Sequence, residues 1–194
     1  MKRTATVKRE TKETTVKITL DLDGDGICNV KTRCGFLDHM LDLLACFAGF
    51  DLCVAGKGDL HVDRHHLVED AGILLGKALK TALGGRKGIA RFGFASLPMD
   101  ETLMNVTLDI SGRPYLAFNV PVMKGQDGRF ETEDAKEFLR GFVNHAGVTL
   151  HVNFLYGDNL HHVNEAIFKG LGLALKQAVA VGGSRLPSTK GSLD

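Results

Sequence analysis

The first clear pattern along the chain is an alternation of apolar and polar residues from Thr14 to Asp23. A period of two is typical of a strand with one buried face, and the Asp-Gly-Asp-Gly sequence at 23–26 is a turn signal. A second strand-like segment runs from Ile27 to Thr32. We therefore predict two strands joined as a hairpin.

Apolar residues then adopt the three-to-four spacing of an amphipathic helix, beginning at Gly35 and continuing through Leu44. A short strand, Asp51–Val54, is predicted next. A second helix is predicted from His65 to Leu83, where the following Gly-Gly pair is typical of a helix end.

The second half of the chain repeats the first. Glu101–Gly112 aligns without gaps on Glu13–Gly24, and His145–Val152 aligns on Phe47–Val54. The pattern then predicts a strand, a helix, a strand and a helix, in the order Tyr115–Val122, Thr132–Asn144, Val148–Phe154 and His161–Val179. An internal repeat of this length indicates two copies of one supersecondary unit packed together.

We therefore predict an α+β fold of two similar halves, residues 1–90 and 91–181, each a two-layer unit of a sheet backed by helices. Halves of about ninety residues are small for independent domains, so we expect them to share a core as one compact unit. Residues 182–194 are rich in Gly, Ser, Pro and Lys, which predicts a C-terminal loop.

Composition narrows the possible partners. The 194 residues include 44% hydrophobic and 24% charged residues and carry a net charge of +1, so neither a nucleic acid nor a membrane is expected as a partner. The basic N-terminus lacks the apolar segment of a secretory signal. The four cysteines form no Cys-x-x-Cys pair, and we interpret them as reduced thiols of a cytoplasmic protein.

Candidate chemistry lies in a repeated His-His-x-x-Glu motif. One copy is His65-His66 with Glu69, and the other is His161-His162 with Glu165. Residues three or four apart share a helix face, so each glutamate can bind a metal ion together with one of its histidines. Adjacent histidines are turned about 100° apart around the helix axis, so they are poorly placed to bind the same ion. Two sites are therefore predicted, each supplied by both halves or by neighbouring subunits.

A single histidine pair near a helix end is usually a solvated or capping feature. The repetition at matching places favours metal binding, and imidazole with carboxylate suits manganese, iron or zinc. No cysteine accompanies the motifs and no His-Glu-x-x-His is present, which disfavours a structural zinc site and a zinc peptidase. His39 aligns on Glu137, and both are candidates for further ligands.

Isolated basic residues form a second set of candidates. Arg113 directly follows a predicted strand, and Lys190 lies in a Pro-Ser-Thr-Lys-Gly loop whose hydroxyls and backbone N–H groups suit phosphate binding. Arg91 and Lys169 are also isolated rather than parts of a basic run. Each of these side chains could equally be a solvated charge.

Taken together, nine segments resemble the imidazoleglycerol-phosphate dehydratase family over essentially the full length. These segments are Arg3–Ala5, Thr11–Thr14, Leu22–Gly24, Phe36–Leu41, Asp63–Asp70, Pro98–Glu101, Gly157–Glu165, Phe168–Lys169 and Pro187–Gly191. The resemblance implies a four-stranded sheet backed by helices in each half. It also implies a homo-oligomer, a 24-mer, with active sites between subunits and two manganese ions (Mn²⁺) per site.

The implied reaction is the dehydration of imidazoleglycerol phosphate to imidazole acetol phosphate in histidine biosynthesis. The implied metal ligands are His39, His65, His66, Glu69, Glu137, His161, His162 and Glu165. Some family members carry histidine where this chain has Glu137, which still suits manganese. The implied substrate and phosphate contacts are Arg91, Arg113, Lys169, Ser188 and Lys190.

The resemblance assigns proton transfer to Glu13, and we expect His39, His66 and Glu165 to take part in catalysis with it. Two cations that flank the imidazole ring would stabilise it as an imidazolate, from which the side-chain hydroxyl can leave. Two other interpretations remain open: a metal-storing scaffold that lacks a phosphate site, and a two-metal hydrolase that releases inorganic phosphate.

Overall fold

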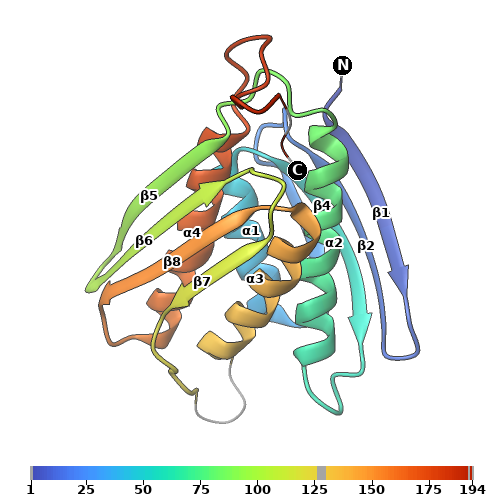
Figure 1. Cartoon of the computed structure of the whole chain (residues 1–194). Helices are drawn as coiled ribbons and strands as arrows, with labels where there is room; N and C mark the ends of the chain where they lie inside the picture. The colour runs from blue at the N-terminus through green and yellow to red at the C-terminus, as the bar shows by residue number, and fades with distance from the viewer. Residues whose placement is uncertain (1, 126–129, 192, 194) are drawn as a thin grey trace.

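The computed structural model describes residues 2–125, 130–191 and 193. The elements follow the same order in both halves (Figure 1). In the first half they are β1 (Thr4–Glu10), β2 (Thr14–Asp21), β3 (Cys28–Lys31), α1 (Gly35–Ala48), β4 (Asp51–Gly58) and α2 (His65–Leu83). In the second half they are β5 (Phe92–Met99), β6 (Thr102–Asp109), β7 (Tyr115–Asn119), α3 (Thr132–Ala146), β8 (Thr149–Tyr156) and α4 (Leu160–Ala178).

Each half contains a four-stranded sheet, with orders β1-β2-β4-β3 and β5-β6-β8-β7. The predicted hairpin between the strands at 14–23 and 27–32 is wrong, because β3 pairs in parallel with β4 and does not pair with β2. The chain passes through α1 between β3 and β4, and a helical crossover of this kind is what parallel pairing requires. The second half repeats the arrangement, with β7 parallel to β8.

Two edge strands were absent from the strand pattern predicted along the chain. In β1 only Ala5 is buried, so no run of apolar residues marks the strand. In β5 the alternation is present, but its buried residues are Gly93, Ala95 and Leu97, two of which carry little or no side chain. Their backbone pairing with β2 and β6 defines them better than their hydrophobicity does.

The helices lie between the two sheets, as Figure 1 shows. The largest helix contacts join the halves: α2 packs on α3, and α1 packs on α4. Buried apolar residues from both halves form one continuous cluster. The predicted α+β class, with a sheet backed by helices in each half, is thus confirmed. No helix in the described part of the chain is long and apolar enough to cross a membrane.

Glycines at equivalent places let the helices of the two halves approach closely. A Cβ at Gly76 of α2 would lie 2.4 Å from the carbonyl oxygen of Phe142 in α3. A Cβ at Gly172 of α4 would lie 2.7 Å from the carbonyl oxygen of Leu44 in α1. Both obstacles are backbone atoms, so a side chain at either position would push two helices apart.

Gly76→Ala is therefore expected to destabilise the fold by about 1–3 kcal/mol, the usual cost of overpacking a core. Gly35→Ala is the matched control, because a Cβ there would meet nothing within 4 Å. Thermal unfolding of both variants measures the difference, and equal melting temperatures would show that α2 and α3 separate without cost.

Candidate functional site

Both histidine pairs lie at helix starts. The side chain of Asn159 caps α4 by accepting hydrogen bonds from the backbone N–H groups of His161 (2.9 Å) and His162 (3.4 Å). At the start of α2, Asp63 Oδ1 accepts from the backbone N–H of His65 at 2.7 Å. Asn159 is thus a side-chain cap of α4, whereas Asp63 lies one residue before the N-cap position of α2, Arg64, which has no side-chain cap. Each histidine pair lies on the first turn of its helix, where adjacent side chains point in different directions.

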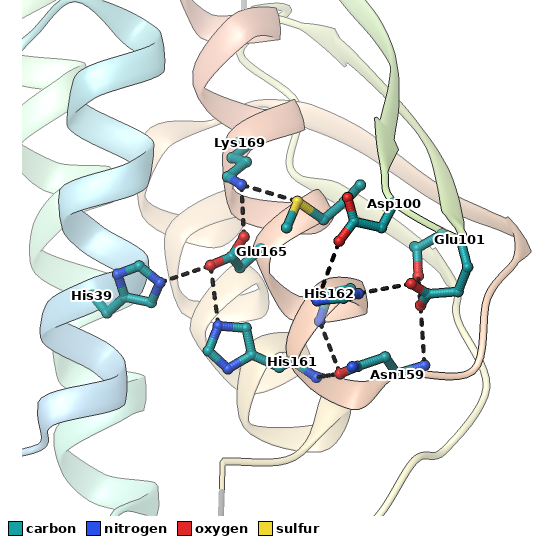
Figure 2. Close-up of polar contacts among 10 residues, drawn as sticks. His39, Asp100, Glu101, Asn159, His161, His162, Glu165 and Lys169 are labelled. Atoms are coloured by element: carbon teal, nitrogen blue, oxygen red, sulfur yellow. Dashed lines mark hydrogen bonds and ion pairs between the residues drawn. The ribbon is translucent and has the colours of Figure 1, made fainter.

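The tightest cluster joins α1 to α4 (Figure 2). His39 Nε2 lies 2.8 Å from Glu165 Oε1, and His161 Nε2 lies 3.1 Å from the same oxygen. One potential ligand atom from each of the three residues lies within 4.8 Å of the others. His39 comes from the first half and the other two residues from the second, so the packing of α1 on α4 creates the cluster.

Lys169 neutralises the carboxylate of Glu165. Its Nζ donates to Glu165 Oε2 at 2.6 Å and also lies 3.2 Å from the sulfur of Met99. Burial alone would raise the pKa of Glu165, but hydrogen bonds from Lys169, His39 and His161 outweigh it and hold that pKa at about 2. The cluster therefore contains a carboxylate that is ionised at neutral pH, which suits cation binding.

His162 points away from this cluster, toward the turn between β5 and β6 (Figure 2). Its ring is nearly perpendicular to that of His161, at 89°, with the ring centroids 6.2 Å apart. His162 Nδ1 lies 2.7 Å from Glu101 Oε2. This hydrogen bond raises the pKa of His162 and, from the other side, lowers the pKa of Glu101 to about 2.

His66 occupies the equivalent position on α2, and its partner is Asp59. His66 Nδ1 lies 3.1 Å and 3.2 Å from the two carboxylate oxygens of Asp59, and this contact raises the pKa of His66. Glu13 is farther away, with Oε2 3.9 Å from the same nitrogen. The rings of His65 and His66 are also nearly perpendicular, at 84°.

The counterparts of the His39 cluster are Glu137, His65 and Glu69. Glu137 is only 6% exposed and lies on α3, one turn before the glycine at which α3 contacts the backbone of Glu69. Its carboxylate forms an ion pair with the more exposed Arg140, although its Oε2 makes no hydrogen bond of normal geometry. Within residues 2–125, 130–191 and 193, only the His39 cluster brings three potential ligand atoms within 4.8 Å of one another.

The chemistry of the clustered donors fits a metal ion. Two imidazole nitrogens and a carboxylate are a donor set that manganese, iron and zinc accept. The buried carboxylate of Glu137, which is paired with Arg140, supplies a further oxygen donor at the equivalent place in the other helix pair. The residues therefore fit the metal ions that the sequence predicts.

The predicted phosphate contacts, apart from Lys169, gather at the other end of α4. Arg91 holds Asp109 with two hydrogen bonds of 2.6 and 3.0 Å and donates to the carbonyl oxygen of Pro187 in the C-terminal segment at 2.8 Å. Its backbone N–H bonds to Ala178, the last residue of α4. At 1.5 Å per residue, Ala178 is about 20 Å along the helix from Glu165.

The other predicted contacts are exposed or only half-buried. Arg113 and Lys190 are exposed, and Ser188 is half-buried with its hydroxyl accepting from the Lys190 backbone N–H at 3.2 Å. Residues 192 and 194 of the predicted C-terminal loop lie outside the described residues. One copy of the chain therefore does not bring Arg91 and Lys190 to the His39 cluster.

Asp59, Glu101 and Asn159 belong to the site but were not predicted from the sequence. Glu101 could have been found, because it aligns on Glu13 in the internal repeat. Asn159 precedes the second histidine pair at a capping position, which is a recognisable signal. Asp59 carried no such signal, since its contact with His66 depends on the path of the loop between β4 and α2.

Comparisons with known proteins agree with this fold. The family model for imidazoleglycerol-phosphate dehydratase matches residues 32–175. Imidazoleglycerol-phosphate dehydratase from Azorhizobium caulinodans is 55% identical, and the match covers 98% of each chain. Crystal structures of the enzymes from Pyrococcus furiosus and Staphylococcus aureus superpose with TM-scores of 0.85 and 0.83 at 40% and 37% identity. The match to the first covers 96% of this chain and all of that one, and the match to the second covers 92% and 99%.

The duplicated fold and its relatives define an enzyme of the hydro-lyase class, which eliminates water from its substrate. The chain belongs to the imidazoleglycerol-phosphate dehydratase family, since both the family model and the full-length relatives match it.

Proposed function

We propose that this chain dehydrates imidazoleglycerol phosphate to imidazole acetol phosphate in histidine biosynthesis, with two manganese ions in each active site. The observation that carries the proposal is the convergence of His39, His161 and Glu165 within 4.8 Å in a chain of this family. The four cysteines are free, which fits the reducing cytoplasm that we propose as its compartment.

In this proposal His39, His161 and Glu165 hold one ion, and His65, Glu69 and Glu137 contribute to the other. His66 and His162 complete the two sites with the nitrogens that their carboxylate partners leave free. The ions, when bound, would stabilise the substrate's imidazole ring as an anion and so assist departure of the neighbouring hydroxyl. Together with the ions, His39, His66 and Glu165 would fix the ring in one orientation.

Glu13 is the candidate for proton transfer. Its side chain is 57% exposed and lies 3.9 Å from His66 Nδ1, so it borders the metal-binding residues without a short hydrogen bond to His66. A carboxylate that is free to move between two positions can accept a proton from carbon and later release it. Glu13→Gln should therefore lower turnover while leaving manganese affinity unchanged.

The distance along α4 supports a shared active site. Arg91, Arg113, Ser188 and Lys190 are proposed to bind the substrate phosphate, but Arg91 is anchored about 20 Å along the helix from Glu165. A second copy of the chain would have to supply them, whereas Lys169 already contacts Glu165 within one chain. This requirement supports the proposed homo-oligomer with its sites between subunits. The proposed number of subunits, that of a 24-mer, is what the resemblance to the family implies.

Lys190→Ala should weaken substrate binding roughly 10-fold or more, the loss of about 1.5–3 kcal/mol expected for a hydrogen bond to a charged group. Manganese affinity should stay unchanged, because Lys190 is exposed and belongs to none of the histidine clusters. Calorimetric titrations with substrate and with manganese measure the two effects, and Lys8→Ala serves as an exposed-lysine control. A selective loss of manganese would refute the phosphate role.

A product assay distinguishes the proposed reaction from its rivals. Incubation with imidazoleglycerol phosphate and manganese should give a product that has lost one water, detected by mass spectrometry, without release of inorganic phosphate. A two-metal hydrolase would release phosphate instead. A metal-storing scaffold would form no product, and its melting temperature would not rise with a phosphate ligand.

A further inference from the structure

The second histidine of each pair, which is the less exposed of the two, is held by a carboxylate, yet the two carboxylates come from different places in the repeat. Glu101 holds His162 at 2.7 Å, and Asp59 holds His66 at 3.1 Å. Glu101 aligns on Glu13, whereas Asp59 is the first residue after β4. The duplicated halves thus reach the same contact by different residues.

The second half cannot place an acidic side chain where the first half has Asp59. The residue that directly follows β8 is Gly157, which has a φ of +144°. A Cβ at this position would lie 2.3 Å from the hydroxyl oxygen of Thr102, next to the register shift between Leu103 and Met104. An aspartate at 157 is therefore excluded by both backbone conformation and space.

The two halves also differ in the hydrogen-bond partner of an equivalent buried threonine. Thr14 and Thr102 align in the repeat and both are buried. Thr14 donates its hydroxyl to Asp70, whereas Thr102 donates to Glu101 Oε1 at 2.8 Å. The residue equivalent to Asp70 in α4 is Ala166, which offers no acceptor. Thr102 is therefore available to orient Glu101, and Thr14 is not available to orient Glu13.

The backbone of Asn159 adds another constraint on Glu101. Its N–H donates to Glu101 Oε1 at 3.3 Å, while its side chain caps α4. One carboxylate oxygen of Glu101 therefore faces Thr102 and Asn159, and the other faces His162. Among the residues that the structure describes, the carboxylate of Glu13 has, by contrast, only the longer 3.9 Å contact with His66, so it keeps its freedom.

We propose that Glu101 and Asp59 are positioning residues for His162 and His66, and that Asp59 thereby leaves Glu13 free for proton transfer. An ionised carboxylate can only accept, so it fixes the ring tautomer that carries its hydrogen on Nδ1. Nε2 then keeps its lone pair for a metal ion, and the ring is held in one orientation. This inference rests on the proposed metal-dependent function.

Manganese titration of the metal-stripped protein tests the inference. Glu101→Ala and Asp59→Ala should each lower manganese affinity about 10- to 100-fold, the usual effect of losing a partner behind a ligating histidine. Glu101→Gln should restore much of the affinity, because its amide oxygen can still accept from Nδ1. Glu10→Ala is the matched control for charge, because it removes an exposed carboxylate from β1, in the sheet that Asp59 follows.

The melting temperature of the metal-free variants separates positioning from folding. It should fall no further for Glu101→Ala than for Glu101→Gln, although their manganese affinities differ. If Glu101→Ala does not fold, Asp59→Ala tests the same pairing in the other half. Affinities for both alanine variants equal to that of Glu10→Ala would overturn the inference.

Two further variants keep this result distinct from the proposed function. His162→Ala should lose at least as much manganese affinity as Glu101→Ala; if it loses none, His162 is not a ligand and the proposed metal site itself fails. If His162→Ala loses affinity and Glu101→Ala does not, only the positioning role fails. An affinity loss in Glu13→Gln as large as that in Glu101→Ala would overturn the division of roles between these two glutamates.

Discussion

Stripping divalent metal ions with a chelator is expected to abolish dehydration, and manganese alone is expected to restore it. The chain brings His39, His161 and Glu165 within 4.8 Å, and without a cation both histidines bond to the carboxylate of Glu165. Among the described residues of this cluster and its contacts, the positively charged side chain is Lys169, and it is already paired with Glu165. The protein alone therefore offers little to stabilise an anionic ring.

The assay follows product formation after dialysis, after re-addition of manganese, and after addition of magnesium as a control. Magnesium prefers oxygen ligands in octahedral geometry, so histidine-rich sites should respond to it weakly. Size-exclusion chromatography of the stripped protein measures the assembly, which should loosen if ligands come from more than one copy. Full activity in protein shown to be free of metal would contradict the proposed metal dependence.

The features predicted well from the sequence are those that depend on local pattern. The start of α2 at His65 and its end at Leu83 agree with the prediction, because a long amphipathic repeat and a following Gly-Gly pair mark the boundaries. The repeat alignment also located β6 and both histidine pairs. Two copies of one pattern supply evidence that a single copy lacks.

The features that the sequence pattern missed depend on contacts between distant segments. The pairing of β3 with β4 in parallel is set by the crossover through α1, and nothing within residues 27–32 distinguishes it from a hairpin strand. The contact between Glu101 and His162 joins residues sixty-one positions apart. It exists because the β5–β6 turn lies beside the start of α4, which only the folded arrangement brings about (Figure 2).

The alignment of Glu137 on His39 suggested two equivalent metal sites, one in each helix pair. In the structure the side chains of these two sites are arranged differently. His39, His161 and Glu165 already converge, whereas Glu137, His65 and Glu69 do not do so among the described residues. The difference follows from side-chain partners: Glu165 is drawn toward two histidines, and Glu137 pairs with Arg140 on its own helix. Equal sequence positions therefore do not guarantee equal geometry.

Glu165→Gln is expected to reduce manganese affinity more than the roughly 10- to 100-fold caused by loss of a residue that only hydrogen-bonds to a metal ligand. Manganese occupancy and turnover should fall with it. The substitution keeps the shape of the side chain but removes the charge that faces His39, His161 and Lys169. Lys169 then adds an unopposed positive charge beside the site, which further disfavours a cation. Metal analysis of the purified variant and calorimetric titration measure the occupancy directly.

The double variant Glu165→Gln with Lys169→Met separates these two causes. If the lost ligand is responsible, the double variant should bind manganese as weakly as Glu165→Gln. If the unopposed lysine is responsible, removing it should recover much of the affinity, and Glu165 would then act through charge balance rather than by binding the ion. Unchanged occupancy in Glu165→Gln alone would remove Glu165 from the metal site, because no other described carboxylate lies within reach of both His39 and His161.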